Sequence, residues 1–480
     1  MKITFLIPPC FTKGETPAER SAGCTRIVYP FPNLYELGVA AVMEEQGHEV
    51  KLEDFVYDEH TPDDLRAFLK HDDSDLYVMW GVNLSIPDDV ATIEMMKEER
   101  PQARVIMLGP SGTYFPDKFL SDAPETVIVR GEPEATLPQV VTAIENGTPL
   151  SDVKGVIISK DGRSFRTPPR PLIKDVDALP FPARHLLADR QYHNPKLKTG
   201  PYTTALTSRN CPFHCIYCVP SSLTFARELD FRHDSGRKPP IAFRSIESVD
   251  KEMKMLHDQG YRAIGFVDDN FIWNEERTLA LCDIMRRYGF VWGCQARVDA
   301  ITEPIAKALS ESGCGYVDLG IESFDDEILK YVKKGITSAQ IVEAVKLLKK
   351  YDVSVKLNIL IGTSPLETKN TIKDTIRKAK KLKVDQVMIN IISPFPGTEF
   401  YATALENGWI EGNEYRPTNV QRESILNYPH LKSRDMERLL FKSNINFFLD
   451  PRFVFRQLRK FRSWKEFRAA FKALKVKLFG

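Results

Sequence analysis

Three cysteines, Cys211, Cys215 and Cys218, lie within eight residues of one another and follow a short apolar stretch. Cysteine thiolates bind zinc and iron, and closed zinc sites and iron–sulfur cubanes usually have four protein ligands. Three ligands leave one metal position free to bind a small molecule. The residue type and the spacing therefore indicate a reactive metal centre at this point of the chain.

Two other uses of these cysteines follow from the residues alone. His214 could complete a zinc site, although it adjoins Cys215 and zinc patterns normally place a second ligand pair well apart in the sequence. A disulfide framework is disfavoured because eight cysteines in 480 residues are sparse. The opening apolar run also stops at Pro8-Pro9 without a basic region or a cleavage site. We therefore expect reduced thiols in a cytoplasmic protein.

The CxxxCxxC spacing, Tyr217 directly before the last cysteine and the position of the motif after a strand resemble the radical S-adenosylmethionine (SAM) superfamily. The resemblance implies a [4Fe–4S] cluster on the three cysteines, whose unique iron chelates SAM. It also implies a flavodoxin- or ferredoxin-type donor, whose electron lets the cluster cleave SAM to a 5′-deoxyadenosyl radical. The cofactors would carry the chemistry, and the protein would orient and shield them.

Length and composition limit the remaining possibilities. A chain of 480 residues corresponds to two to four domains at about 100–200 residues each. Its 42% hydrophobic and 27% charged residues are typical of a globular protein. No apolar run reaches the roughly 18–20 residues that a membrane-spanning helix needs. The net charge of +1 indicates no particular partner.

Short apolar segments alternate with helix-length spacers over residues 1–150. We expect a helix over 34–46 and strands over the segments 2–7, 49–55, 76–80, 104–109 and 126–130. This alternation predicts an α/β domain with a doubly wound, flavodoxin-like parallel sheet. Ligands of such folds bind beyond the carboxyl ends of the strands.

This first domain, directly upstream of the cysteine motif, resembles the cobalamin-binding domain of cobalamin-dependent radical SAM enzymes. The resemblance implies that residues at the carboxyl ends of its strands contact cobalamin, namely Ser85, Gly109, Ser111, Gly112 and Gly131. The Asp-x-His-x-x-Gly signature, by which some cobalamin proteins donate a histidine to cobalt, is absent. A doubly wound domain without a cofactor is the alternative.

Residues 151–197 are expected to form a linker with a hairpin around Asp161-Gly162, followed by several prolines. Over residues 198–405 the alternation resumes, and most of the expected strands end in a polar or acidic group. We expect these strands over 263–267, 291–295, 316–321, 355–361 and 386–392. The pattern resembles the partial (β/α)6 barrel of radical SAM enzymes, whose active site lies at the carboxyl ends of the strands.

The resemblance assigns SAM-binding roles to several residues of this barrel. Asp268, Asp269 and Asn270 stand where the family contacts the methionine amino group. Arg297 could pair bidentately with the methionine carboxylate. Glu322 stands at the ribose or amino end of SAM, and Gly362 would let the backbone approach the adenine. The alternatives are that Asp269 caps a helix and that Arg297 forms a structural ion pair.

Residues 406–480 are expected to be helical, and their last part is strongly basic. The segment 451–480 contains ten lysines and arginines and one acidic residue, Glu466. Apolar residues recur in it at helical spacing. A basic amphipathic helix of this kind binds anionic membrane surfaces, which predicts peripheral membrane contact. Packing on the barrel is an alternative, and nucleic-acid binding is supported only by the charge.

The domain order most resembles the branch that contains the anaerobic magnesium-protoporphyrin ester cyclase and the hopanoid-modifying radical enzymes. It implies hydrogen abstraction from an unactivated carbon of an apolar, lipid- or tetrapyrrole-like small molecule, followed by methyl transfer from methylcobalamin. Radical cyclisation, ring contraction or another rearrangement is one alternative. A zinc-containing nucleic-acid-binding module is the other.

Overall fold

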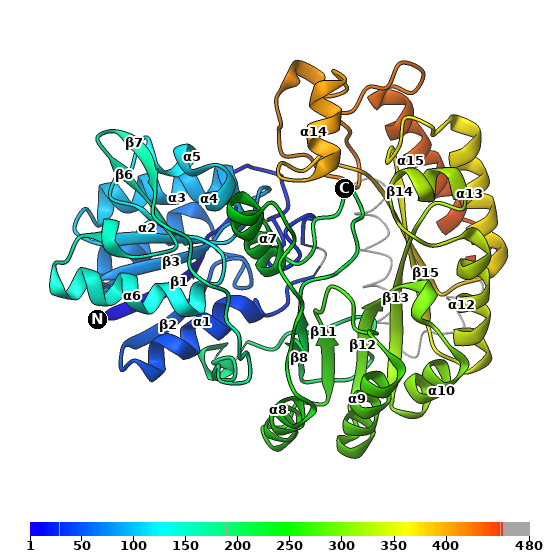
Figure 1. Cartoon of the computed structure of the whole chain (residues 1–480), viewed down its shortest axis with the longest axis horizontal. Coiled ribbons are helices and arrows are strands. Elements are labelled where there is room, and N and C mark those ends of the chain that lie inside the picture. The colour runs from blue at the N-terminus through cyan, green and yellow to red at the C-terminus, as the bar shows by residue number, and fades with distance from the viewer. Residues whose placement is uncertain (28, 188–189, 452, 455–480) are drawn as a thin grey trace.

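The computed structural model describes residues 1–480 except 28, 188–189, 452 and 455–480. Within these residues the chain forms two α/β units that lie side by side, each built on a largely parallel sheet (Figure 1). The predicted α/β class is therefore confirmed.

The first unit is a seven-stranded sheet in the order β2-β1-β3-β4-β5-β6-β7. Its strands are β1 (Lys2–Ile7), β2 (Glu49–Asp54), β3 (Leu76–Trp80), β4 (Arg104–Leu108), β5 (Val127–Val129), β6 (Val156–Lys160) and β7 (Arg163–Arg166). The five parallel strands have the flavodoxin-like order 2-1-3-4-5, and the strand order reverses between β1 and β3. The predicted doubly wound fold is confirmed.

Six helices and a 3-10 turn accompany this sheet. They are α1 (Leu34–Glu45), α2 (Pro62–His71), α3 (Ile86–Glu99), α4 (Pro110–Tyr114), α5 (Pro116–Leu120), α6 (Pro133–Asn146) and η1 (Leu150–Asp152). Strand β3 is fully buried along its length, as expected for a parallel strand that is covered on both faces.

The hairpin of β6 and β7 continues the first sheet. Strand β6 pairs antiparallel with β5, and the hairpin turns at Asp161 and Gly162, which have φ values of 52° and 73°. Two successive positive φ values are typical of a type I′ turn. The hairpin occurs where the sequence predicts it, but the first sheet extends to Arg166, beyond the limit at residue 150 that we expected. The domain boundaries stay a prediction.

The second unit is a six-stranded parallel sheet whose neighbouring strands follow one another along the chain. Its strands are β8 (Tyr202–Ala205), β11 (Ala263–Phe266), β12 (Val291–Ala296), β13 (Cys314–Glu322), β14 (Val355–Ile361) and β15 (Gln386–Ile391). Strands β9 (Ser208–Arg209) and β10 (Ala242–Phe243) form a separate antiparallel pair. This arrangement is a partial (β/α)6 barrel, as predicted.

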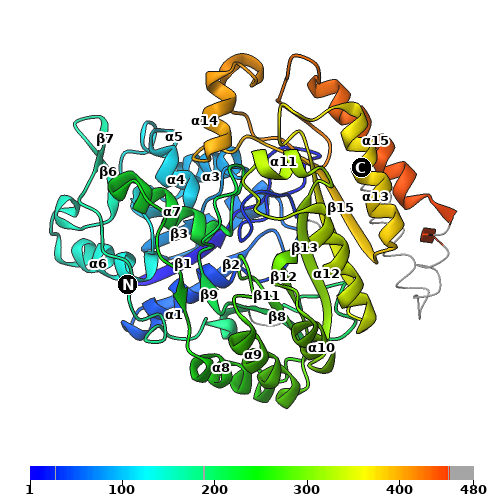
Figure 2. The ribbon, with the colours of Figure 1, turned by 45° about the vertical axis from the view of Figure 1, so that its right-hand side comes forward.

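Helices cover one side of the curved second sheet (Figure 2). The linker itself contains η2 (Arg184–Leu187). The helical elements that follow it in the described residues are α7 (Ser222–Ser235), α8 (Ile246–Asp258), α9 (Glu275–Tyr288), η3 (Val298–Ala300), α10 (Glu303–Glu311), α11 (Asp326–Tyr331), α12 (Ser338–Lys350), α13 (Lys369–Leu382), α14 (Glu399–Glu406), η4 (Glu411–Asn413) and α15 (Ser433–Phe448). Capping boxes begin α12 at Thr337 and α13 at Thr368. Because alternate residues of β14 are fully buried, one face of that strand packs on the helices.

Helix α7 lies between the two units and directly follows the cysteine motif (Figure 1). It packs against α4 of the first unit. At its first turn, Trp80 Nε1 donates a hydrogen bond to Ser222 Oγ at 2.9 Å. The end of β3 and the start of α7 are therefore in direct contact.

The described C-terminal part consists of α14, a long loop and α15, which packs on α13 and β15. Almost all of the basic segment 451–480 lies outside the described residues, so its predicted helix and membrane contact stay predictions. No helix in the described part of the chain is both long enough and apolar enough to cross a membrane.

Candidate functional site

The three cysteines lie on the loop between β9 and α7, where each is half-buried and none forms a disulfide. Asn210, directly before the first cysteine, has a φ of 75°. Its backbone N–H donates to Thr224 Oγ1 at 3.2 Å, and its side-chain oxygen accepts a hydrogen bond from Arg227. Helix α7 therefore fixes the start of the loop that carries the thiols.

The environment of the thiols opposes their ionisation in the absence of a cation. Burial raises the pKa of Cys211 to about 11. Burial, together with the negative charges of Cys215 and Cys211, raises the pKa of Cys218 further. A bound metal reverses this preference because its charge stabilises thiolates. The donor set thus fits a metal cluster.

Two of the predicted SAM-site residues lie next to this loop. Glu322, at the end of β13, accepts hydrogen bonds from Lys334 Nζ at 2.8 Å and from the Tyr217 hydroxyl. The Arg297 guanidinium lies 3.5 Å from the centroid of the Phe213 ring, within the cysteine loop. The structure therefore brings Tyr217, Arg297 and Glu322 to the same edge as the cysteines.

The charges at this edge are paired. Arg297 Nε and Nη2 donate to the two carboxylate oxygens of Asp299 at 3.0 and 2.9 Å. This is the structural ion pair that we considered as the alternative role of Arg297. Burial would lower the pKa of Lys334, but the neighbouring Glu322 carboxylate, with a further contribution from Cys215, raises it. The ammonium group of Lys334 therefore stays charged beside Glu322.

The acidic stretch after β11 mainly holds the cysteine loop in place. Asp268 is fully buried and accepts hydrogen bonds from the Thr207 backbone and from the hydroxyls of Thr207 and Ser208. Asp269 accepts at 2.6 Å from both the Ser221 N–H and the Thr224 hydroxyl, at the start of α7. Burial raises the pKa of Asp269 to about 6. Asp269 thus fixes the first turn of α7 from another element, and the N-cap residue of that helix is Ser221.

Asn270 differs from the two preceding aspartates. Its side-chain nitrogen donates to the Ile272 carbonyl at 2.8 Å, but its buried Oδ1 has no hydrogen-bond partner in the described part of the chain. A buried acceptor without a partner is unfavourable, so a donor from a bound molecule would stabilise it. Of the three consecutive residues, Asn270 is the one with a polar atom that has no partner among the described residues, and its predicted contact with SAM stays a prediction.

Gly362 has an intramolecular role that sequence reasoning missed. Its φ is +86°, and an added Cβ would lie 2.7 Å from Met436 Sδ on α15. Its N–H donates to Glu367 at 2.9 Å, and its carbonyl accepts from the Tyr428 hydroxyl at 2.7 Å. The close packing of α15 therefore explains this glycine, and the predicted contact with adenine stays a prediction.

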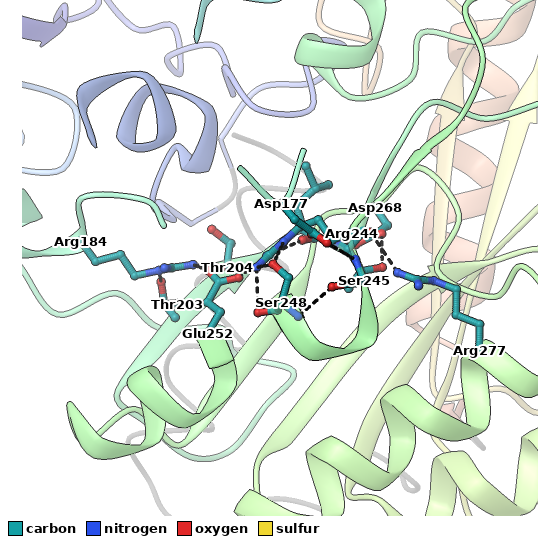
Figure 3. Close-up of polar contacts among 12 residues, drawn as sticks. Asp177, Arg184, Thr203, Thr204, Arg244, Ser245, Ser248, Glu252, Asp268 and Arg277 are labelled. Atoms are coloured by element: carbon teal, nitrogen blue, oxygen red, sulfur yellow. Dashed lines mark hydrogen bonds and ion pairs between the residues drawn. The ribbon is translucent and has the colours of Figure 1, made fainter. Parts of the chain in front are cut away.

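A buried network of charges ties the linker to the start of the barrel (Figure 3). Glu252 on α8 accepts from Arg184 of the linker at 2.7 Å and from Arg244. Burial of Glu252 opposes its ionisation, but the two guanidinium groups lower its pKa. Arg277 donates to the Thr207 carbonyl at 3.1 Å, next to Asp268. No sequence signal predicts this network because its members are far apart along the chain.

The glycines at the carboxyl edge of the first sheet are closely packed against the protein itself. Gly109 has a φ of +86°, and an added Cβ would lie 2.5 Å from the Gly81 carbonyl oxygen. A Cβ on Gly112 would lie 2.9 Å from Ile128, and one on Gly131 would lie 2.9 Å from Asp230 on α7. These positions therefore require glycine independently of any ligand.

The polar residues at the same edge fall into two groups. The Ser85 hydroxyl donates to Asp89 at 2.6 Å and accepts from the Val82 N–H at 3.0 Å, so it is fully engaged. Ser111 Oγ and Asn83 Oδ1, in contrast, are buried without a hydrogen-bond partner among the described residues. These two atoms are the ones that a cofactor at this edge could satisfy.

Buried ion pairs connect this edge to the cysteine loop. Glu132, at the start of α6, accepts from Arg209 Nη1 at 3.1 Å and lies 2.9 Å from Arg227 Nε. Glu134 accepts from Arg209 Nη2 at 2.7 Å. Arg209 and Arg227 flank the cysteine motif in the sequence, on β9 and α7. The two edges are therefore held together by charged side chains that sequence reasoning did not single out.

The described residues contain no three His, Cys, Asp or Glu side chains that surround one position suitable for a single ion. A cubane instead binds one cysteine at each of three irons, so its ligands are spread apart. The described residues therefore form no preformed single-ion site that includes His214.

Comparisons with known proteins agree with this geometry. Residues 206–379 match the model of the radical SAM superfamily. An uncharacterized methyltransferase from Pyrococcus horikoshii is 30% identical over 462 residues, which cover 95% of each chain. The anaerobic magnesium-protoporphyrin IX monomethyl ester cyclase of Rubrivivax gelatinosus is 25% identical over 79% of this chain and 67% of its own.

A solved structure has the same fold. The cobalamin-dependent SAM radical enzyme OxsB, with aqua-cobalamin and SAM bound, matches all of this chain and 72% of its own, with a TM-score of 0.71 and 14% identity. Together with the cysteine loop between two α/β units, the family model and the 30% identical relative establish the assignment: the chain belongs to the radical SAM superfamily.

Proposed function

We propose that this protein is a cobalamin-dependent radical SAM methyltransferase. The observation that carries the proposal is the position of the cysteine loop, whose following helix, α7, directly contacts the carboxyl edge of the first sheet. When bound, a [4Fe–4S] cluster, SAM and cobalamin would supply an electron, a 5′-deoxyadenosyl radical and a methyl group.

The residues of the barrel edge would hold the cluster and SAM. Cys211, Cys215 and Cys218 would bind three irons. Glu322 and Arg297 lie beside them and carry charges suited to an amino acid's ammonium and carboxylate groups. Glu322 has a φ of 58°, an uncommon value for a residue with a side chain, and such backbone conformations cluster at functional sites. Asn270 would contribute its free acceptor.

The residues of the first sheet would hold cobalamin. Asn83 and Ser111 offer buried polar atoms that have no partner within the described residues. Glycines at 109, 112 and 131 shape this edge by close packing. The fold likeness to OxsB supports a cofactor-binding first domain, whose sheet reaches Arg166, followed by a linker, a barrel and a helical C-terminal region.

Methylation is favoured over rearrangement because the relative with 30% identity over nearly the whole chain is named a methyltransferase. The 25% identical relative is named a cyclase, so radical cyclisation is the second candidate. We further propose an apolar small-molecule substrate and a flavodoxin- or ferredoxin-type electron donor. Membrane contact through residues 451–480 is part of the same proposal.

The test is anaerobic reconstitution with iron, sulfide and hydroxocobalamin, followed by reduction with dithionite in the presence of SAM deuterated at its methyl group. We expect a retained corrinoid and 5′-deoxyadenosine, and transfer of deuterium to a product when cell extract is added. Formation of 5′-deoxyadenosine by protein that retains no corrinoid would contradict the cobalamin assignment. A product without the deuterated methyl group would favour cyclisation.

A further inference from the structure

A pair of lysines shares one carboxylate inside the second unit, away from the cysteine edge. Lys196, from the linker, and Lys356, on β14, donate to the same oxygen of Asp318 on β13, at 2.8 and 2.9 Å. The three side chains are 14%, 12% and 9% exposed. Across the described residues, the ion pairs of both lysines are with Asp318 alone. The group therefore carries one excess positive charge in a nearly buried place.

Within this group the positive charges outnumber the negative ones, and one hydrogen-bond acceptor has no donor among the described residues. The other oxygen of Asp318, Oδ1, is buried and has no hydrogen-bond partner in the described part of the chain. Burial lowers the pKa of Lys356 in spite of the nearby carboxylate. An ion pair that only stabilises the fold needs one lysine. The Tyr316 ring, whose centroid lies 4.2 Å from Lys196 Nζ, offsets part of the cost of the second buried ammonium group, and an anion would offset the rest.

The sheet presents this group on an accessible face. In the parallel register Gln295 of β12 lies opposite Asp318, and Asp318 lies opposite Lys356. Gln295 is exposed although it belongs to an internal strand, whereas its neighbours Cys294 and Ala296, on the other face, are buried. The face of the sheet that carries Asp318 is therefore open to solvent at Gln295.

A strip of half-exposed residues leads from this group toward the cysteine edge. The next cross-strand row contains Gly320, Asn358 and Met388, which pair in register and are all half-exposed. Glu322 lies four residue steps beyond Asp318 on β13, which corresponds to about 13 Å along the strand at roughly 3.3 Å per residue. The distance between the lysines and the proposed SAM site is therefore one that a single small molecule can span.

We propose that Lys196 and Lys356, oriented by Asp318, bind an anionic group of the substrate, a carboxylate or a phosphate. The inference rests on the proposed function, since it places the reacting carbon near Glu322 and the anionic group at the far end of the molecule. The substrate then has an elongated body along Gly320 and Met388 and one charged end. Asp318 Oδ1 accepts a hydrogen bond from a hydroxyl or amino group beside that end.

Calorimetry of the reconstituted full-length enzyme, with inorganic phosphate as the probe against chloride at equal ionic strength, tests this site without requiring turnover. Phosphate at about 50 times its dissociation constant should raise the melting temperature of the wild type by roughly 2–4 °C. Lys356→Gln should abolish the rise. The control Lys254→Gln, which changes an exposed lysine paired with Asp258, should retain it.

Asp318→Asn separates a binding site from a structural ion pair. Asp318 orients both ammonium groups and favours the charged form of Lys356, so its removal should weaken phosphate binding about tenfold. If the lysines serve only the fold, Asp318→Asn leaves the phosphate shift of the wild type unchanged, and this outcome overturns the proposal. An equal phosphate effect in Lys356→Gln and the wild type, or none in the wild type, also overturns it.

Two further measurements complete the design. Acetate in place of phosphate distinguishes a carboxylate site from a phosphate site, because the matching anion gives the larger shift. Formation of 5′-deoxyadenosine by the wild type, without substrate, tests the proposed function separately. Phosphate binding that depends on Lys356 in protein that never cleaves SAM would therefore count against the proposed function and not against the anion site.

Discussion

The carboxyl edges of the two sheets are built in different ways. At the first sheet, glycines pack closely against backbone and side-chain atoms, and two polar atoms, on Asn83 and Ser111, have no partner within the described residues. At the second sheet, specific side chains form the edge. The cysteines lie beside two ion pairs, Arg297 with Asp299 and Glu322 with Lys334. A glycine-lined surface leaves room for a large, rigid cofactor. An edge with cysteines and charged side chains is suited to bind a metal cluster and an amino acid.

Loss of one cysteine should have the largest effect on the second edge. Cys215→Ala removes one of three cluster ligands, so we expect loss of the cluster and a fall in 5′-deoxyadenosine formation of at least about a thousandfold. Iron and sulfide analysis with product quantification measures both. Cys282→Ala, a change in the hydrophobic core, serves as the control and should retain the cluster. A Cys215→Ala protein with four irons and normal SAM cleavage would contradict the assignment.

Breaking the connection between the edges should have the next largest effect. Glu132→Ala leaves Arg209 and Arg227 buried without this partner, which should lower the free energy of unfolding by about 3–5 kcal/mol. Urea unfolding measures the change. Glu145→Ala, which removes a partly exposed ion pair with the N-terminus, should change it by about 0–1 kcal/mol. Equal effects of the two variants would show that the buried pairs do not hold the edges together.

Features of the two edges that depend on neighbouring residues can be predicted from the sequence, and features that depend on distant residues cannot. The strands, the hairpin at Asp161-Gly162 and both sheet types follow from apolar alternation and turn residues, which are local signals. The cysteine motif is local as well. Contacts such as Arg227 with Glu132 join residues 95 positions apart, and no local pattern encodes them.

The same distinction separates the site residues. The sequence predicts that Tyr217, Arg297 and Glu322 lie at the cysteine edge, because each lies in the motif or at the end of a strand, and the structure places them there. It could not show that Asp268 is fully engaged with Thr207 and Ser208, because those partners precede it by about 60 residues. Lys196 was also missed, since a single lysine in a linker gives no signal until the fold places it beside Asp318.

A side chain added at the first edge should disturb it by contact and by backbone strain. Gly109 has a φ of 86° and a ψ of −175°, a conformation essentially limited to glycine, and an added Cβ would meet the Gly81 carbonyl. Gly109→Ala should lower the free energy of unfolding by about 1–3 kcal/mol and reduce corrinoid retention. Gly147→Ala is the matched control, because Gly147 has a φ of 63° but open space around it. Equal destabilisation would mean that close packing at Gly109 contributes nothing.

The smallest expected effect over a single pH unit concerns a buried carboxyl group beside the first edge. Glu36 accepts from the Trp80 N–H at 3.2 Å and from Asn33 at 2.8 Å, and its burial raises its pKa from 4.5 to about 8. The folded protein therefore keeps a proton that the unfolded chain releases, so stability is lost as the pH rises from 4.5 to 8. Glu36 contributes at most about 1.4 kcal/mol per pH unit to the slope of the free energy of unfolding against pH.

Glu36→Gln should remove this slope, because glutamine does not ionise and matches the neutral carboxyl in size. Urea unfolding of the wild type and the variant between pH 5 and 8 gives free energies whose difference should grow with pH in favour of the variant. The exposed Glu45→Gln change should leave the wild-type profile intact. Parallel profiles for Glu36→Gln and the wild type would show that Glu36 is ionised in the folded protein. The first edge would then carry one more buried charge besides Glu132 and Glu134, and its contrast with the second edge would lie in its glycines.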